Sequence, residues 1–307
     1  MGHLIELQTK IMKMGIDGFS ICGYTDINRN SGMTMLLCDR PNTSGIFQSG
    51  GSPASHEISL LNSNHRPDYS IDGILMTGRS VFGLALISEV YRYLRNINAG
   101  SRLDDNYIPI VPAAAIYDLD VNGEIPDREW IERAFKTIGK NIPVGPFWGG
   151  TGATVSKYSN GRRIRSGQGY YEISLNNVRV GVYVILNSLG DIYDLNGRNL
   201  TNKNIGSLNK LKEKIIEGTI WNEFTRDFKF NTTISAVITN AKISHSEANY
   251  IAEAANFGLA SRIWPYSTSL DGDTVFCVSS CKYTEPVDKI AEMARMAAEL
   301  AVLSIFF

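Results

Sequence analysis

The chain contains 307 residues, and its 30 Lys and Arg are balanced by 31 Asp and Glu, for a formal net charge of −1. This balance excludes the strong positive charge that drives binding to nucleic-acid phosphates, so no nucleic-acid partner is expected. Hydrophobic residues make up 43% and charged residues 20% of the chain, which is typical of a folded protein with a large core and excludes disorder as the default.

In the first half of the chain, apolar residues switch between the two-residue repeat of strands and the longer repeat of helices. Strands are predicted at Gly32–Cys38 and Ile71–Thr77, and an extended segment at Ile108–Tyr117, where prolines oppose a helix. Helices are predicted at Val81–Leu94 and Glu129–Lys140. The first helix should bury one apolar face, formed by Phe82, Leu84, Ala85, Ile87 and Val90.

The second half contains two strongly β-branched runs, Val178–Leu186 and Thr232–Thr239, which predict buried strands. Between them the composition becomes rich in Asn and Lys, and residues 196–231 are predicted to form a flexible linker. This linker leads directly into the second strand.

Two long helices close the chain. The first follows the capping-box pattern Ser244-His-Ser-Glu247 and should end at Gly258, where glycine suits a C-cap. The second begins at Thr284-Glu-Pro286, with proline at an early helical position. Because strands and helices interleave without an even repeat, the sequence predicts a layered α/β protein.

Neither the cysteines nor the apolar runs indicate export or a membrane. No run reaches the roughly 18 consecutive apolar residues that span a bilayer, and the N-terminus lacks a secretory signal. The four cysteines are too few for a disulfide framework, and no ligand set for zinc accompanies Cys277 and Cys281. We therefore expect a cytoplasmic protein with no membrane contact and no metal.

Three interpretations fit Asn231-Thr232-Thr233, where the linker meets the second β-branched run. As Asn-x-Thr it matches a glycosylation acceptor, although nothing else indicates secretion. The threonines also suit the start of a strand by propensity alone. In the third interpretation the bond before Thr232 cleaves itself, because the Thr232 hydroxyl attacks the preceding carbonyl and hydrolysis then frees Thr232 as a new N-terminus. Its α-amine, with an ordinary pKa of about 8, would be the general base for its own hydroxyl.

The glycine-rich run Gly149-Gly-Thr-Gly-Ala-Thr-Val-Ser-Lys157 is not a phosphate-binding loop. The P-loop pattern fails because Lys157 follows a serine, and the dinucleotide pattern fails because its third glycine is missing. What remains is a backbone with unusual conformational freedom that approaches another group closely. Both a substrate pocket at Gly150, Thr151 and Gly152 and a tight crossing of strands fit this run.

Asp271-Gly-Asp273 places two carboxylates just before the apolar run Thr274–Val278. They form either a solvated turn or an acidic pair that positions a protonated amine or shares protons with a nucleophile. The four histidines form no triad-like set, and no G-x-S-x-G elbow is present, which disfavours a Ser-His-Asp hydrolase.

Nine segments, spread in order along most of the chain, carry a family resemblance. They are Gly23–Asp26, Ser31–Thr34, Ile71–Leu84, Ile108–Leu119, Gly150–Thr154, Leu186–Asp191, Asn231–Ile234, Thr239–Ala241 and Asp271–Phe276. Together they resemble the family of L-aminopeptidase/D-esterases and β-peptidyl aminopeptidases, which includes the nylon-oligomer hydrolases. No single segment is decisive, and the resemblance rests on their order and number.

The resemblance implies a single large domain with a four-layer αββα sandwich that cleaves itself after Asn231. The products would be an α piece of residues 1–231 and a β piece of residues 232–307 that stay associated. Thr232 would be the nucleophile, and Asn187 matches the family's Asn that stabilises the oxyanion.

Four further residues match the nylon-oligomer branch of the family. Lys157 and Tyr117 fall where that branch carries an accessory Lys and Tyr, and Asp271 and Asp273 match its two acidic residues near the nucleophile. The aminopeptidase branch carries Ser and Glu at the two acidic positions, which weakens the case for recognition of a free N-terminal amine. Arg79 is another departure, since family members usually carry a glycine there.

The leading hypothesis is an N-terminal-nucleophile hydrolase that acts on short peptides, β-peptides, other amides or 6-aminohexanoate oligomers, without a cofactor. Two other classes stay open: an acyltransferase of the ornithine acetyltransferase type, and an unprocessed protein that does not catalyse. The resemblance also implies a tetramer-like homo-oligomer. The alanine-rich stretch Ala291–Ala298 suits close helix packing, either within the chain or between copies of it.

Overall fold

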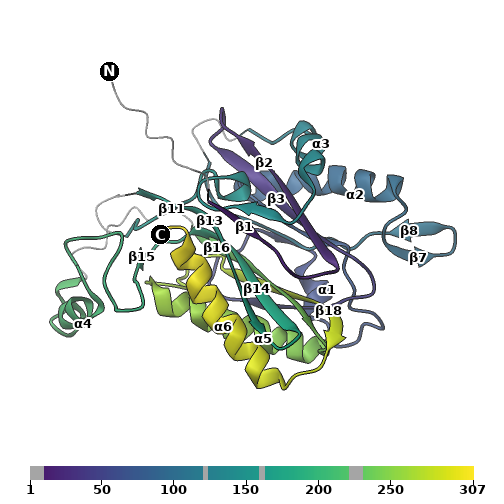
Figure 1. Ribbon diagram of the computed structural model, residues 1–307. Helices are drawn as coiled ribbons and strands as arrows, with labels where there is room; N and C mark the ends of the chain where they lie inside the picture. Colours follow the sequence, from purple (N-terminus) through teal and green to yellow (C-terminus); the bar gives the residue numbers. More distant parts are fainter. Residues whose placement is uncertain (1–9, 120–123, 159–162, 221–230) are drawn as a thin grey trace.

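The computed structural model describes residues 10–119, 124–158, 163–220 and 231–307, and its longer strands form two five-stranded sheets (Figure 1). The first sheet contains, in spatial order, β2 (Phe19–Asp26), β3 (Ser31–Cys38), β6 (Gly73–Thr77), β9 (Ala113–Ala115) and β5 (Ser55–His56). The second contains β13 (Gly167–Leu175), β14 (Val178–Asn187), β16 (Thr232–Ala241), β18 (Thr274–Tyr283) and β4 (Thr43–Gln48).

Helices and shorter strands complete the described chain. The α-helices are α1 (Ile58–Asn62), α2 (Ile87–Asn96), α3 (Glu129–Ala134), α4 (Leu208–Ile216), α5 (His245–Arg262) and α6 (Val287–Ser304). The 3-10 helices are η1 (Ser80–Leu86), η2 (Phe135–Thr137) and η3 (Trp148–Gly150). The short strands are β1 (Ile11–Lys13), β7 (Ser101–Leu103), β8 (Asn106–Ile108), β10 (Asn141–Pro143), β11 (Thr154–Val155), β12 (Ile164–Arg165), β15 (Asp191–Ile192) and β17 (Ile263–Trp264).

Alternation along the strands decides what each face of a sheet packs against. In β14, Val180, Val182 and Val184 join the apolar cluster beneath α5 and α6, whereas Tyr183 and Ile185 join the cluster between the two sheets. A third cluster packs the first sheet against α2 and α3. The order of layers is therefore helices, second sheet, first sheet, helices, as Figure 1 shows from bottom to top. The predicted layered α/β organisation is confirmed.

The capping box that begins α5 is confirmed, but the predicted end of this helix is wrong. Ser244 accepts from the backbone of Glu247, whose side chain accepts from the backbone of Ser244. The helix continues past Gly258, where a Cβ would lie only 2.2 Å from the carbonyl oxygen of Arg295 in α6. Gly258 therefore lets two helices approach closely instead of capping one of them.

The helix predicted at Val81–Leu94 is divided into η1 and α2, so its single apolar face does not form. With three residues per turn, η1 leaves Phe82 and Ala85 exposed to solvent. Ile87 and Val90 are buried, because they belong to α2. The helix predicted at Glu129–Lys140 is likewise shorter, and its α-helical part ends with α3 before η2 tightens the backbone.

The segment predicted as a flexible linker, residues 196–231, lies only partly within the described chain, since residues 221–230 are outside it. Residues 196–220 contain α4 and contribute Ile205, Leu211 and Ile220 to a small buried apolar cluster. This part therefore differs from the linker predicted there. The reason is that its few apolar side chains pack against Tyr158 and Trp264, which are distant in sequence.

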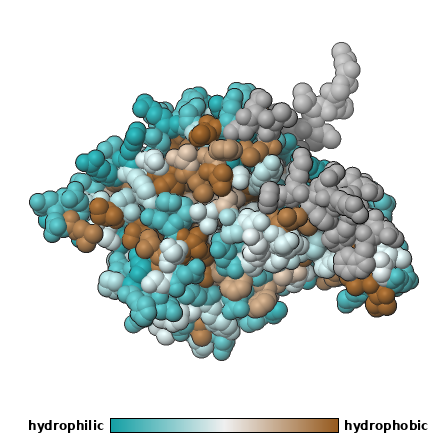
Figure 2. Space-filling view, turned by 180° about the vertical axis from the view of Figure 1, so that it is seen from behind, coloured by the Kyte–Doolittle hydropathy of each residue, from teal (hydrophilic) through white to brown (hydrophobic). Residues whose placement is uncertain are grey.

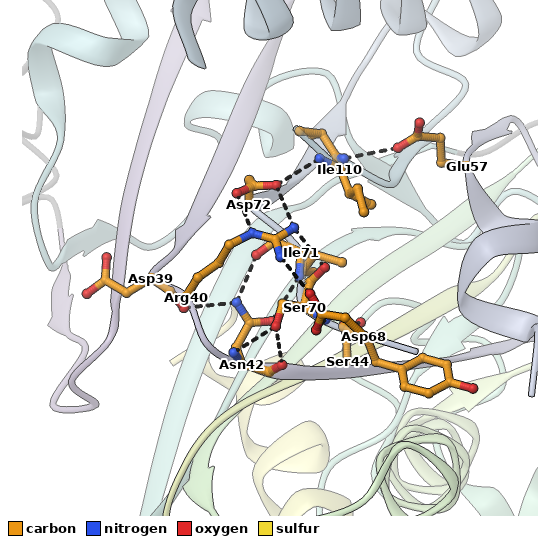
Figure 3. Close-up of polar contacts among 12 residues, drawn as sticks. Asp39, Arg40, Asn42, Ser44, Glu57, Asp68, Ser70, Ile71, Asp72 and Ile110 are labelled. Atoms are coloured by element: carbon orange, nitrogen blue, oxygen red, sulfur yellow. Dashed lines mark hydrogen bonds and ion pairs between the residues drawn. The ribbon is translucent and has the colours of Figure 1, made fainter. Parts of the chain in front are cut away.

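A polar network joins the loop after β3 to the segment before β6 (Figure 3). The Arg40 guanidinium donates to both oxygens of the buried Asp72 carboxylate, at 2.8 and 3.0 Å, and to Asp68 at 2.9 Å. The second oxygen of Asp72 also accepts from the backbone N–H of Ile110 at 2.8 Å. Asn42 bridges the same loops through its amide, which donates to the carbonyl oxygen of Ile71 at 2.8 Å. These bonds fix the start of β6 and so the position of the first sheet.

Hydrophobic groups on the face opposite to Figure 1 gather in several separate patches among hydrophilic ones (Figure 2). Within the described ranges, no helix is long and apolar enough to cross a membrane.

Candidate active site

The bond between Asn231 and Thr232 lies at the entry to β16, the central strand of the second sheet. The Thr232 hydroxyl donates to the carbonyl oxygen of Asn231 at 2.5 Å, and the backbone N–H of Gly272 donates to the same oxygen at 3.0 Å. The N–H of Asn231 in turn donates to the carbonyl oxygen of Leu270 at 3.1 Å. Both Asn231 and Thr232 are buried, so the peptide group between them lies away from bulk water. Backbone hydrogen bonds hold it in place.

Strand pairing brings the other candidate residues to this point. β16 runs antiparallel to β14, which sets Asn187 opposite Thr232. It runs parallel to β18, which sets Ile234 beside Thr274 and continues as an isolated bridge between Asn231 and Asp271. The sheet register therefore gathers segments separated by 40 or more positions at one end of the sheet.

Asn187 connects three segments through its side chain. Its Oδ1 accepts from Lys157 Nζ at 2.7 Å and from the backbone N–H of Thr154 at 3.1 Å. Its Nδ2 donates to the carbonyl oxygen of Tyr117 at 3.2 Å. Lys157 Nζ also donates to the main-chain carbonyl oxygen of Asn187, at 3.1 Å. The structure thus brings Thr232, Asn187, Lys157 and Tyr117 together.

Burial lowers the pKa of Lys157 from its ordinary value of 10.5 to about 7, because the charged ammonium loses its hydration. The positive charge of Arg163 acts in the same direction, whereas the carboxylates of Asp271 and Asp118 oppose it. Near neutral pH a large fraction of Lys157 is therefore a neutral amine, which can accept a proton.

Asp271 and Asp273 both organise the start of β18 and are both buried, with 2% and 1% exposure, so the solvated-turn interpretation is wrong. Asp271 Oδ2 accepts from the N–H and the hydroxyl of Thr268, both at 2.7 Å. Asp273 accepts from the N–H of Thr233 at 2.6 Å and from the N–H of Ser267 at 3.2 Å. In this way Asp273 supplies a side-chain acceptor to the residue that follows Thr232.

The two carboxyl groups favour the protonated form more than a solvated aspartate does. Burial raises the pKa of Asp271, although its bonds to Thr268 and the charge of Lys157 act against this. Burial also raises the pKa of Asp273 well above its usual range, and the negative charge of Asp271 adds to that effect. The pair can therefore hold a proton close to Thr232.

A cavity of about 400 Å³ opens beside Thr232. Its lining residues are Ser52, Pro53, Ala54, Ser80, Val81, Ala115, Tyr117, Leu119 and Thr232. The lining within the described chain is neutral and mostly apolar, which suits an uncharged hydrocarbon or amide portion of a small molecule.

Gly150, Thr151 and Gly152 lie at a close crossing of backbone rather than in the lining of this cavity. A Cβ at Gly150 would be 2.4 Å from the backbone nitrogen of Gln168, and one at Gly152 would be 2.5 Å from a carboxylate oxygen of Asp118. The hydroxyl of Thr151 donates a hydrogen bond to the carbonyl oxygen of Trp148 at 2.6 Å. The geometry matches the tight-crossing interpretation, and a role in substrate binding stays a prediction.

Two acidic residues near the site were not singled out from the sequence, and the first is Asp118. It accepts from the backbone N–H of Arg79 at 2.6 Å and from the Ser31 hydroxyl at 2.8 Å, and burial raises its pKa to about 6. Its sequence signals were its place in the segment Ile108–Leu119 and the adjacent Tyr117. Arg79 itself has φ of 66°, a conformation that favours glycine, the residue that the motif resemblance leads us to expect at this position.

The second is Asp191, which is fully buried and holds the segment that carries Lys157. Its carboxylate accepts from the hydroxyls of Ser156 and Tyr158, the two neighbours of Lys157, and from Asn199 Nδ2 at 2.9 Å. The Lys157 N–H also donates to a carbonyl oxygen of the loop before Asp191, at 2.8 Å. Asp191 ends the segment Leu186–Asp191 that carries the resemblance, but no sequence signal joined it to its partners, because the members of this cluster lie up to 43 positions apart.

Among the described residues, no group of three or more His, Cys, Asp or Glu side chains is placed to hold a metal ion.

The arrangement of layers is that of the N-terminal-nucleophile hydrolase fold. The L-aminopeptidase D-Ala-esterase/amidase of Ochrobactrum anthropi, described as a variant of that fold, superposes with a TM-score of 0.70 at 16% identity, over 94% of this chain and 84% of that one. A β-aminopeptidase of Burkholderia sp. gives a TM-score of 0.69 at 16% identity, with the same coverage. These likenesses show a mixed α/β fold of the N-terminal-nucleophile hydrolase type.

The profile of peptidase family S58 matches residues 14–305 of the chain. An uncharacterized aminopeptidase of Mycobacterium tuberculosis (strain ATCC 25618 / H37Rv) is 30% identical over 266 residues, which are 81% of this chain and 73% of that protein. The chain therefore belongs to peptidase family S58 and is an aminopeptidase-family hydrolase of C–N bonds. The resemblance inferred from the motifs is confirmed.

The nylon-oligomer branch is also among the relatives. The 6-aminohexanoate-oligomer endohydrolase of Paenarthrobacter ureafaciens is 25% identical over 204 residues, which are 64% of this chain and 57% of that enzyme.

Proposed function

We propose that this chain cleaves itself between Asn231 and Thr232 and then hydrolyses amide bonds with Thr232 as its N-terminal nucleophile. One observation carries the proposal. The Thr232 hydroxyl lies 2.5 Å from the carbonyl oxygen of the peptide bond that it would break, at the entry to a buried strand of an N-terminal-nucleophile hydrolase fold. Strand propensity alone would explain a threonine at this position, but it does not explain a buried carbonyl group beside the threonine hydroxyl.

Self-cleavage proceeds in two steps. In the first, Thr232 Oγ1 bonds to the carbonyl carbon of Asn231, and the C–N bond breaks. A base takes up the hydroxyl proton and passes it to the departing nitrogen of Thr232. We assign this role to the neutral amine of Lys157. In the second, water adds to the resulting ester, and the C–O bond breaks. The products are the Asn231 carboxylate and a Thr232 with a free hydroxyl and a free α-amine.

Amide hydrolysis then uses the same hydroxyl. The α-amine of Thr232 accepts the hydroxyl proton as Oγ1 attacks the substrate carbonyl, and it returns that proton to the leaving amine. Asn187 Nδ2 stabilises the oxyanion that develops on the substrate. Water releases the acyl group from Oγ1 and regenerates the enzyme.

Short peptides, β-peptides and 6-aminohexanoate oligomers are the proposed substrates. The cavity beside Thr232 is lined by uncharged residues, which suits acyl groups built of methylenes and amides. Tyr117 in its wall adds a polar group that such a substrate can contact. The acidic pair Asp271 and Asp273 supports the nylon-oligomer substrates through the motif resemblance, and an endohydrolase of 6-aminohexanoate oligomers is among the relatives. A tetramer-like assembly and a cytoplasmic location stay predictions.

The test is intact-mass spectrometry of the purified chain beside Thr232→Ala. We expect the wild type to separate into a 231-residue piece and the remaining 76 residues, and Thr232→Ala to stay whole. Cleaved protein is then assayed with p-nitroanilides of α-alanine, β-alanine and 6-aminohexanoate, with uncleaved Thr232→Ala as the matched control. A wild type that stays whole under all conditions would refute the proposed nucleophile.

A further inference from the structure

The carbonyl oxygen of Asn231 accepts from a backbone donor outside the proposed hydrolytic set. This donor is the N–H of Gly272, at 3.0 Å, and it reaches the oxygen on which negative charge would develop during self-cleavage. The bonds of the Asn187 amide within the described chain go elsewhere, to Tyr117, Lys157 and Thr154. In the uncleaved chain the scissile carbonyl and Asn187 therefore belong to different hydrogen-bond networks.

We propose that the backbone N–H of Gly272 is the oxyanion donor for self-cleavage, whereas Asn187 serves only the later hydrolysis of substrate. This inference rests on the self-cleavage proposed above. A donor fixed in place before the reaction stabilises the developing charge without reorganisation, which is the basis of oxyanion catalysis. The bridge between Asn231 and Asp271 provides that fixed geometry.

Gly272 is held at this position by the turn that precedes β18. The carbonyl oxygen of Asp271 accepts from the N–H of Ser52 at 2.9 Å, and its N–H donates to the carbonyl oxygen of Thr268 at 3.1 Å. A Cβ at Gly272 would lie 2.7 Å from both Pro53 Cα and the Ser52 carbonyl oxygen. The absence of a side chain lets this backbone pack against the cavity wall while its N–H reaches the scissile carbonyl.

Substrate would meet a different donor because it approaches from the cavity. Tyr117 lines the cavity beside Thr232, and its carbonyl oxygen is the acceptor of Asn187 Nδ2. A substrate carbonyl placed between Tyr117 and Thr232 lies on the side of Asn187. One nucleophile thus acts twice, with a different oxyanion donor in each reaction, and the two reactions become separable by mutation.

The first test compares Gly272→Pro with Gly272→Ala. Both variants add a Cβ that must displace Pro53. Proline in addition removes the N–H and fixes φ, so the two rates are compared only where both variants keep the wild-type fold. Circular dichroism and the unfolding midpoint establish that each variant folds. We expect Gly272→Ala to cleave itself measurably and Gly272→Pro to be slower than Gly272→Ala by about 100-fold or more, the usual effect of losing one oxyanion donor.

The second test uses Asn187→Ala, which removes atoms and so creates no crowding at position 272, and circular dichroism and the unfolding midpoint again establish that it folds. Its main-chain carbonyl oxygen still accepts from Lys157 at 3.1 Å, so the proposed base keeps a partner. Losing the Oδ1 bond to Lys157 should slow self-cleavage by roughly tenfold at most, whereas amide hydrolysis by the cleaved product should fall about 100-fold or more.

The outcomes separate this inference from the proposed function. A wild type that is not cleaved after Asn231 overturns the proposed function itself. A wild type that is cleaved, beside a folded Asn187→Ala that is not, overturns the separate-donor inference alone, as does a Gly272→Pro that cleaves as fast as Gly272→Ala. If neither variant at position 272 folds, the cleavage rate of Asn187→Ala decides between one shared donor and two.

Discussion

Replacing Lys157 by Met should stabilise the uncleaved fold at acidic and neutral pH, and this gain should shrink as the pH rises. The change is made in the Thr232→Ala background, so that every chain stays in one piece. Met has a similar length and fills the same half-buried space, but it carries no charge to desolvate. The folded state then no longer has to bury or neutralise an ammonium group.

The magnitude follows from the pKa of Lys157, which burial lowers from 10.5 to about 7. Because the folded value is the lower one, the unfolded chain binds more protons between these two pH values. The destabilisation is complete below the folded pKa and is lost as the pH approaches 10.5. At about 1.4 kcal/mol per pKa unit, Lys157 destabilises the fold by about 5 kcal/mol at pH 6 and by about 2 kcal/mol at pH 9.

Met also loses the two bonds from Nζ to Asn187, at about 1 kcal/mol each, but this loss does not depend on pH. The robust expectation is therefore a fall of about 3 kcal/mol in the stability difference between pH 6 and pH 9.

Urea unfolding followed by tryptophan fluorescence measures this difference at each pH. Lys212→Met in the same background is the control, because Lys212 is exposed and its replacement removes a lysine while leaving Lys157 and its surroundings unchanged. A Lys157→Met difference that stays constant from pH 6 to pH 9 would show that Lys157 is solvated in the folded protein, and the assignment of Lys157 as a neutral base would fail with it.

Three further substitutions test the fold and the site. Gly258→Ala should lower stability by about 2 kcal/mol, because its Cβ overlaps the carbonyl oxygen of Arg295, and an unchanged unfolding midpoint would contradict the close approach of α5 and α6. Asp72→Asn should lower the free energy of unfolding in urea by about 3 kcal/mol, since it leaves the guanidinium of Arg40 beside a neutral partner. A loss of stability too small to measure would mean that Asp68 alone is enough to pair with Arg40. Asp191→Asn should lower kcat for amide hydrolysis on the order of tenfold with little change in KM. An unaltered kcat would show that the bonds from Ser156 and Tyr158 to Asp191 are not needed to position Lys157.

Elements with local determinants were predictable from the chain. The β-branched runs became β14 and β16 within a few residues of the predicted ends, and the capping box at Ser244 began α5 as expected. The family was also readable, because its motifs are short and keep their order. Gly258 shows the limit of this approach, since only a neighbouring helix distinguishes a C-cap from a packing glycine.

The candidate site depended on contacts between distant residues. Sequence indicated Thr232, Asn187 and Lys157 through family resemblance, but the register of β14 and β16 is what places the first two opposite each other. Sequence left Asp271 and Asp273 as either a solvated turn or an acidic pair, and the fold buries Asp273 against Thr233, 40 positions away. The physical reason is that hydrophobic periodicity and capping act within a few residues, whereas strand pairing and desolvation arise only when remote segments pack together and exclude water.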